Sequence, residues 1–394
     1  MSKITEKFCT HCGAQLTDEA VFCHICGSKI EIVKGVPAAT PMEQTPSAAP
    51  AKAYAQPTGP VQPVYRRPKT LGVAIGVIAI IVVPIILIGV FGTIRFADIG
   101  TLNYEVDSMA ETNIVLNIDN DIGSVDISYD ATMTKLFEAT LDVKGRPGSS
   151  LADAKNFNSF YESGEYLELT FDSGDQQFFF WNKRVFSYDI TIRLHPDALV
   201  DYSILTSTGS SSLVANGLDN LEIPDIYFSA STGRVTIDLS GSVNTTIQDL
   251  DLATSTGRIS VNLGERTLLN TTNVDFSSST GSITLVYADL ILTGDIEWNI
   301  QASTGTITMI ITQDLVLPLT YLASFDVDCS TGSISLSIAY NSTIGYAIEG
   351  AASTGTVDIL GSGSYYESPG YDSAANQNYF DLETSTGSVT AVEK

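Results

Sequence analysis

Positive charge, histidine and tryptophan are scarce in this 394-residue sequence. There are 20 Lys and Arg against 45 Asp and Glu, a formal net charge of −25, and after Arg266 the only basic residue is Lys394. Proteins bind nucleic acid by neutralising phosphates with Lys and Arg, so this balance argues against a nucleic-acid partner. Only His195 lies outside the first 24 residues. A serine nucleophile needs a nearby base, so we predict a non-enzymatic protein with no catalytic and no cofactor-binding residue.

Cysteine is also scarce, and its distribution excludes a disulfide framework. One cysteine, Cys329, stands alone, where we expect a small buried packing residue. The stretch "FCTHCGAQLTDEAVFCHICGSKI" contains two Cys-x-x-Cys pairs, which are Cys9, Cys12, Cys23 and Cys26. Four thiolates on two tight turns fill a tetrahedral shell, so we predict one structural Zn²⁺. His11 and His24 are rival ligands, and we expect both to remain outside the shell.

This stretch resembles the short zinc-ribbon domains found at the N-terminus of many prokaryotic membrane proteins. The resemblance covers about residues 7–30 and matches all four ligand positions. It implies a ribbon domain over residues 1–34.

Two further segments separate the ribbon from the rest of the chain. Residues 35–69 are rich in Pro and Ala without apolar periodicity, which predicts a disordered linker. Residues 71–94 carry no charge. At about 1.5 Å per residue they span a hydrocarbon core of about 30 Å, so we predict one transmembrane helix over 70–95.

Basic residues decide the predicted orientation of this span. Arg66, Arg67 and Lys69 precede it directly, and Arg95 alone follows closely. The positive-inside rule then places the N-terminus in the cytoplasm and the C-terminal domain outside the cell, in the cell membrane as a single-pass protein. Sequons that could be glycosylated only on the outer side agree with this, and they lie at Asn244, Asn270 and Asn341.

The C-terminal half repeats the tripeptide Ser-Thr-Gly. The motifs begin at residues 207, 231, 255, 279, 303, 330, 353 and 385. The first four intervals are 24 residues and the next three are 27, 23 and 32. A fixed period of this length indicates stacked supersecondary units.

Apolar residues alternate on both sides of each motif, which predicts β-strands with one buried face. The buried positions change parity across the motif, as in Leu250 and Leu252 before it and Ile259 and Val261 after it. We therefore expect Ser-Thr-Gly to form a bulge or corner, with Gly in a conformation that other residues avoid. The predicted fold is mainly β, a right-handed parallel β-solenoid of about 24-residue coils over 201–394. An antiparallel sandwich is the competing fold.

Residues 96–200 are expected to form an N-terminal β cap with irregular coils. With this region, the repeat phrase resembles the adhesin-like β-strand repeat of prokaryotic surface proteins, over about residues 110–392. The resemblance implies a β-strand repeat fold more than any activity. Ser211 departs from the pattern, because other repeats place Val or Ile there.

Other chemistries fit the sequence less well. Oxygen ligands for Ca²⁺ could come from Asp119, Asn120, Asp121 and Asp126, although an Asn/Asp turn between strands explains them better. A phosphate loop needs a helix after the glycine, whereas strands follow here, and only Arg234 and Arg258 are basic at the position after Gly.

The sequence thus favours a membrane protein that displays an acidic ectodomain for adhesion or envelope interaction, with an extracellular glycan or protein as its unidentified partner. The alternative is a transmembrane regulator or sensor whose ribbon recruits a cytoplasmic protein. A third hypothesis is an extracellular carbohydrate-active enzyme.

Overall fold

The computed structural model divides the chain into two compact units, Met1–Leu71 and Gly72–Lys394. It describes the following residues: 7–8, 15–16, 96–106, 113–155, 157–162, 166–174, 185–315 and 320–394. For 7–8, 15–16, 157–162 and Tyr166 only the backbone is described.

In the first unit the described residues form a short antiparallel pair, β1 (Lys7–Phe8) and β2 (Gln15–Leu16). The predicted linker over 35–69 and the predicted span over 71–94 both lie outside the described residues. Among the residues that are described, no helix has the length and apolar character needed to cross a bilayer.

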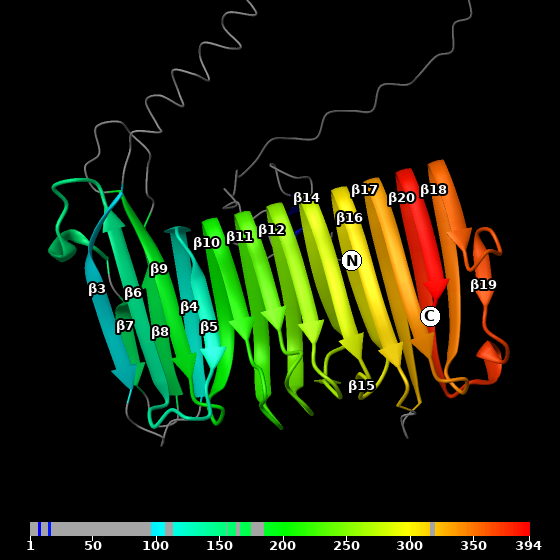
Figure 1. Cartoon of the computed structure of the whole chain (residues 1–394), viewed down its shortest axis with the longest axis horizontal. Coiled ribbons are helices and arrows are strands. Elements are labelled where there is room, and N and C mark those ends of the chain that lie inside the picture. The colour runs from blue at the N-terminus through cyan, green and yellow to red at the C-terminus, as the bar shows by residue number, and fades with distance from the viewer. Residues whose placement is uncertain are drawn as a thin grey trace, which may run out of the picture. The chain divides into compact units, whose positions relative to one another are not determined.

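The repeats of the second unit form parallel strands, which we call the ladder (Figure 1). Its long strands are β10 (Leu199–Val214), β11 (Glu222–Asp238), β12 (Thr246–Leu263), β14 (Asn273–Ala288), β16 (Ile296–Gln313), β17 (Tyr321–Tyr340), β18 (Gly345–Ile359) and β20 (Asn376–Glu393). Short strands β13 (Leu268–Leu269) and β15 (Ile291–Leu292) add a second row of parallel pairs beside them.

Each motif in the ladder lies directly on the motif of the neighbouring strand. Gly233 pairs with Gly257, and Gly257 with Gly281, so the register between these strands equals the 24-residue interval. The mainly-β class is therefore confirmed, and the parallel pairing rules out the antiparallel sandwich for the repeats. The right-handed turn of the predicted solenoid stays a prediction.

The Ser-Thr-Gly motif is the point where the buried face changes. In β12, Leu250, Leu252 and Thr254 are buried before the motif, and Ile259 and Val261 are buried after it. Gly281 shows why glycine is needed: its φ is +150°, and a Cβ there would lie 1.5 Å from the carbonyl oxygen of Gly257. The motif thus combines a conformation that L side chains rarely adopt with a backbone approach that leaves no room for a side chain.

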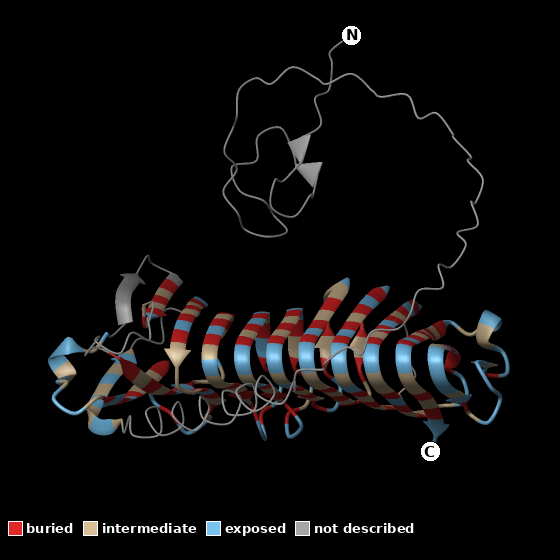
Figure 2. Cartoon of the chain, turned by 90° about the horizontal axis from the view of Figure 1, so that it is seen from above, coloured by how far each residue is buried: buried red, intermediate tan, exposed pale blue. Residues whose placement is uncertain are grey.

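Apolar side chains fill the inside of the ladder, and burial alternates along its strands (Figure 2). Aromatic residues from successive strands stack within this core. The rings of Trp298 and Phe325 lie 5.3 Å apart, and those of Phe325 and Phe380 lie 4.4 Å apart. Cys329 is buried in the same core, as the sequence predicted, and its thiol donates to the carbonyl of Gly305.

The first full repeat carries a serine at a core position where other repeats place Val or Ile. Ser211 is fully buried between Val125 and Val235 of the neighbouring strands, and its hydroxyl has no hydrogen-bond partner within the described structure. The departure seen in the sequence is therefore a real defect of the core, because an unpaired buried hydroxyl lowers stability.

Spatial order departs from chain order at the C-terminal end of the ladder. β20 pairs in parallel with β17 on one side and β18 on the other, so the last repeat lies between the two that precede it (Figure 1). The 32-residue interval before the last motif provides the return path, which includes a 3₁₀ turn at Tyr371–Ser373. Along this path β19 (Tyr365–Glu367) pairs antiparallel with the free edge of β18, and a covered edge resists pairing with other chains.

The strands before β10 combine parallel and antiparallel pairing. They are β3 (Ala97–Val106), β4 (Asn113–Ile122), β5 (Val125–Tyr129), β6 (Phe137–Gly145), β7 (Phe157–Glu162), β8 (Tyr166–Asp172) and β9 (Phe186–Leu194), with a 3₁₀ turn at Leu151–Asp153. β4 and β5 pair in parallel with β10, and β8 and β9 continue these two rows. β6 is antiparallel to β9 and β3 is antiparallel to β6, and we call these three strands the antiparallel end.

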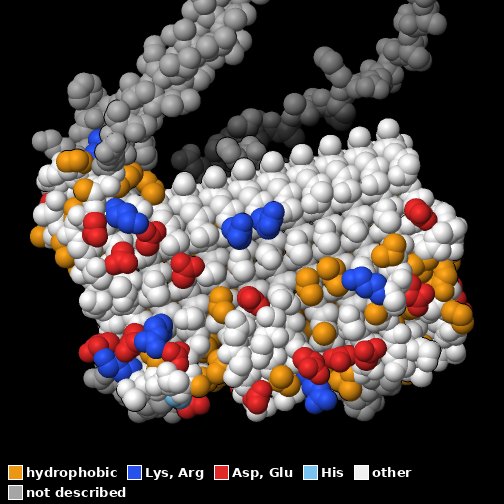
Figure 3. Space-filling view, in the orientation of Figure 1, with side chains coloured by type: hydrophobic (Ala, Val, Ile, Leu, Met, Phe, Trp, Pro, Cys, Tyr) orange, Lys and Arg blue, Asp and Glu red, His pale blue; other side chains and the backbone are white. Residues whose placement is uncertain are grey.

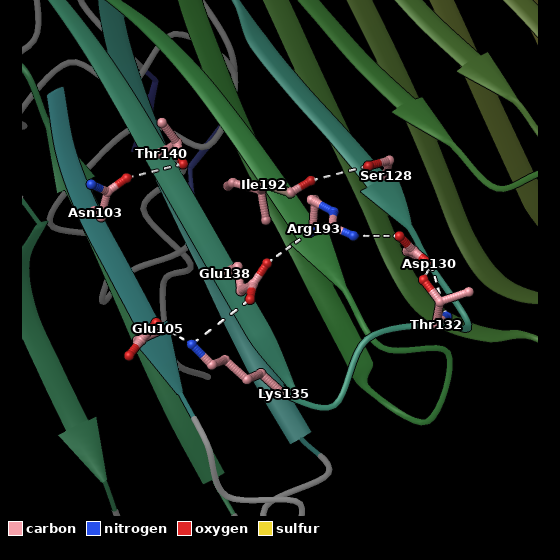
Figure 4. A network of polar contacts seen from close by, with 10 residues as sticks. All are labelled: Asn103, Glu105, Ser128, Asp130, Thr132, Lys135, Glu138, Thr140, Ile192 and Arg193. Carbon is pink, nitrogen blue, oxygen red and sulfur yellow. Dashed lines mark hydrogen bonds and ion pairs between the residues drawn. The ribbon is translucent and has the colours of Figure 1, made fainter.

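Opposite charges pair across the antiparallel end (Figure 4). Arg193 forms ion pairs with Asp130 and with Glu138, the latter at 2.9 Å. Lys135 forms ion pairs with Glu105 and Glu138. Hydrogen bonds from Thr132, followed by the bond and charge of Arg193, lower the pKa of Asp130 to about 2.

Candidate functional site

Two of the predicted zinc ligands, Cys9 and Cys12, fall in the sequence between β1 and β2. Lys7 pairs with Leu16 and Phe8 with Gln15, so β1 and β2 flank the chain segment that holds the first Cys-x-x-Cys pair. All four cysteines lie outside the described residues, so their assignment as ligands stays a prediction; these are Cys9, Cys12, Cys23 and Cys26.

The four residues considered for Ca²⁺ do not converge on one point. Asn120 is buried in β4 and donates to the carbonyl of Tyr188, whereas Asp126 lies in β5 and accepts from Ser212 at 2.6 Å. Asp121 accepts from Ser207 at 3.0 Å. Within the described ranges, no three His, Cys, Asp or Glu side chains are grouped as metal ligands would be.

His195 lies in the turn after β9. Its Nδ1 accepts a hydrogen bond from the backbone of Asp197 at 3.2 Å and lies 3.4 Å from the Asp197 carboxylate. The structure therefore gives this histidine a local role in the turn.

The ladder carries a surface of hydroxyl groups, which we call the hydroxyl face. It consists of the Ser and Thr of each motif and the first and third residues after each motif Gly. In β14 and β16, the first and third residues are Ser282 and Thr284, and Thr306 and Thr308, and these two pairs lie side by side. The motif residues Ser255 and Thr256 are exposed, as are most of their counterparts.

The columns of the hydroxyl face continue along the whole ladder. The first column after Gly contains Ser210, Arg234, Arg258, Ser282, Thr306, Ser333, Ser388 and Thr356. The third column contains Ser212, Thr236, Ser260, Thr284, Thr308, Ser335, Thr390 and Asp358. Figure 3 shows a wide area of uncharged surface over the long strands, with few charged side chains in it. The sequence analysis did not predict this surface, although strand alternation combined with a 24-residue register would have located it.

Acidic side chains gather on the strands before the motifs instead. Asp251 lies beside Asp275, and Asp381 lies between Asp326 and Glu349. Burial and then neighbouring carboxylates raise the pKa of Asp251 and that of Asp381 above the ordinary value. In-register stacking therefore places like charges together on this side of the motif.

The sequon asparagines lie in turns at the ends of ladder strands. Asn244 and Asn270 are exposed, and Asn341 is half-buried and donates to the backbone of Asp314.

Comparison with known proteins finds a family match for the N-terminal domain and distant solved structures. Residues 8–30 match the zinc-ribbon family, which confirms that part of the resemblance. No curated protein matches the sequence. A "putative cell adhesion protein" from Clostridium sporogenes is similar at 12% identity with a TM-score of 0.28, over 75% of this chain and 99% of that chain. A "putative adhesin" from Bacteroides fragilis is similar at 9% identity with a TM-score of 0.22, over 76% and 97%. Both names agree with the adhesin-like resemblance, but at these TM-scores the likeness by itself supports neither a fold nor a function for this chain.

Proposed function

We propose that this chain is a non-enzymatic, single-pass membrane protein that displays the ladder on the cell surface for adhesion or envelope interaction. The hydroxyl face carries this proposal. It presents Ser and Thr in register over all eight repeats, on a backbone that the stacked glycines hold in one conformation. Regular, rigid hydroxyl groups suit an extended partner such as a glycan or a protein strand, because little ordering is needed on binding.

The same proposal includes the finer features of the architecture. The repeats complete a right-handed parallel β-solenoid, residues 71–94 cross the membrane, and the ribbon lies in the cytoplasm with one structural Zn²⁺. The family match over residues 8–30 supports the zinc. The basic residues before the span support the orientation.

Attachment of cells that display the full chain tests the proposed function. A double substitution on the hydroxyl face, Thr280→Glu with Thr306→Glu, should reduce attachment to target cells at least fivefold. The matched control adds the same charge in exposed turns, with Ser240→Glu and Ser342→Glu, and should attach like the parent. Equal attachment by both double variants would exclude the hydroxyl face as the adhesive surface.

Protease treatment of intact cells, with tags at both ends, tests the topology. We expect loss of the C-terminal tag and survival of the N-terminal tag. Survival of a protease-sensitive C-terminal tag until the membrane is opened would overturn both the orientation and the surface role.

Metal analysis tests the ribbon separately. Cys12→Ser in the full chain should abolish stoichiometric zinc, because a structural site needs all four thiolates, and should leave the unfolding of the repeats unchanged. Retained zinc at one equivalent would contradict the four-cysteine assignment.

A further inference from the structure

Two arginines interrupt the hydroxyl face at adjacent strands. Arg234 of β11 and Arg258 of β12 are direct partners in the first column after the motif Gly, and both side chains are exposed. The fold does not require arginine at this position, because the six other ladder strands place Ser or Thr there.

The two guanidinium groups have no anionic partner in the described part of the chain. Neighbouring strands lie about 4.8 Å apart, and like charges directly opposite each other on a sheet are unfavourable. Arg258 instead donates its Nε–H to Ser282 Oγ at 3.1 Å. Asp126 is the acidic residue that lines the same surface, and it accepts a hydrogen bond from Ser212 at 2.6 Å. The pair therefore keeps donors available to a ligand.

The surface around the pair is hollowed. Arg234 and Arg258 line a depression of ≈ 870 Å³ together with hydroxyl groups that include Ser210, Thr232 and Ser282. In Figure 3, two adjacent basic side chains lie within a wide uncharged area of the ladder. Positive charge, neutral hydroxyl donors and an open shape thus occur in one place.

We propose that this depression binds an oxyanion, a carboxylate or a sulfate, carried by a sugar of an otherwise neutral glycan. Guanidinium groups donate two parallel hydrogen bonds to such groups, and flanking Ser and Thr hydroxyls bind sugar hydroxyls. The overall charge of −25 repels a long polyanion, which selects a ligand with isolated negative charges. The inference names the ligand class of the hydroxyl face and rests on the proposed function.

Binding of defined glycan probes to the immobilised full chain tests the proposal. The probes are multivalent polymers that display glucuronate, a 6-sulfated galactose or neutral galactose, so that the arms separate a carboxylate source from a sulfate source. One anionic probe should bind at least tenfold more tightly than the neutral probe, and its binding should weaken as salt is raised. Equal binding of all three probes would overturn the proposal.

Substitution of the two arginines tests whether they are responsible for the tighter binding of the anionic probe. Arg234→Gln with Arg258→Gln should reduce binding of the anionic probe at least tenfold, and the matching double change to Lys should recover part of it, because charge remains while the two-pronged geometry is lost. Arg266→Asn is the control for loss of an exposed positive charge elsewhere, since it removes one arginine from a turn where φ is +58°, which Asn tolerates, and it should bind like the parent. An unchanged affinity in the glutamine double variant would overturn the proposal, provided its melting temperature equals that of the parent.

Cell attachment keeps this inference distinct from the proposed function. If attachment persists in the glutamine double variant, the adhesive role stands and the oxyanion is not the ligand through which the cells attach. If the parent chain itself does not promote attachment, the proposed function fails, and the probe measurement still decides whether the depression binds an oxyanion.

Discussion

The antiparallel end and the ladder arrange their charges in opposite ways. In the antiparallel end, Arg193 of β9 lies opposite Glu138 of β6, because antiparallel strands bring unrelated parts of the sequence together. In the ladder, parallel register places each repeat on the next, so Asp381 lies beside Asp326 and Arg234 beside Arg258. A ladder of similar repeats therefore places residues of the same type next to one another on neighbouring strands. It is stable where the stacked residue is glycine, apolar or a hydroxyl, and strained where that residue is charged.

The largest effect should come from placing a side chain at one of the motif glycines that stack along the ladder. Gly281→Ala puts a Cβ 1.5 Å from the carbonyl oxygen of Gly257 at a positive φ, so we expect a loss of roughly 4 kcal/mol or more in the free energy of unfolding. Gly294→Ala is the matched control, because a Cβ there meets no atom within 4 Å. Chemical unfolding followed by circular dichroism measures both, and an unchanged midpoint for Gly281→Ala would contradict the corner.

A gain in stability should follow from repairing the polar defect of the ladder. Ser211→Val removes an unpaired buried hydroxyl and continues the column of Val125 and Val235, so we expect about 1 kcal/mol of added stability. Ser260→Val, on the hydroxyl face, should show no such gain. A loss of stability in Ser211→Val would mean that the site has no room for the larger side chain.

The antiparallel end should respond to loss of its central cation. Arg193→Gln removes ion pairs to Asp130 and Glu138, so we expect a small loss of stability at neutral pH, because solvent screens exposed ion pairs. The pKa of Asp130 is lowered to about 2, so its stabilising contribution is present above its ordinary pKa and disappears as pH falls toward 2. Melting curves between pH 7 and pH 2 should therefore show the parent and variant converging in acid. If the difference in melting temperature between parent and variant stays constant from pH 7 to pH 2, the ion pairs are not its cause.

The smallest effect on stability should come from the stacked carboxylates of Asp326, Asp381 and Glu349, and it should depend on pH in the opposite direction. The pKa of Asp381 is raised by burial and by neighbouring carboxylates, so protonation favours the folded state and stability from this group rises as pH falls through the raised pKa. Asp381→Asn should flatten this dependence and raise the melting temperature at pH 7 by about 1–2 °C. Asp372→Asn, in the exposed loop, is the control for the change in net charge. A lower melting temperature for Asp381→Asn would argue against repulsion among these carboxylates.

Much of the fold could be predicted because the sequence encodes the same structural unit several times. The alternation around the motif located the strands, and the change of parity between Leu252 and Ile259 located the corner. The ribbon could be predicted from the cysteine spacing alone, which the family match over residues 8–30 confirms. The predicted span and the zinc ligands lie outside the described residues and stay predictions.

The functional surface was harder to predict. The sequence pattern was used only to place strands and corners, so a broad hydroxyl surface was not predicted, and the strands that follow each motif Gly disfavoured a phosphate site. Arg234 and Arg258 become neighbours only when 24 residues of chain return to the same place on the next strand. The 24-residue interval between the motifs was visible in the sequence. That it makes the two arginines neighbours became clear only from the strand register.

The sequence by itself determined the period, the two buried faces of each repeat and the need for glycine at the corner, because these follow from local alternation and backbone sterics. Only the tertiary structure decided that β20 lies between β17 and β18, and that Arg193 meets Asp130 and Glu138. The physical reason is that any repeat offers nearly the same hydrogen-bonding edge and apolar face to any other. The choice of neighbour then depends on loop length, edge protection and the packing of the whole core, none of which is written in a single repeat.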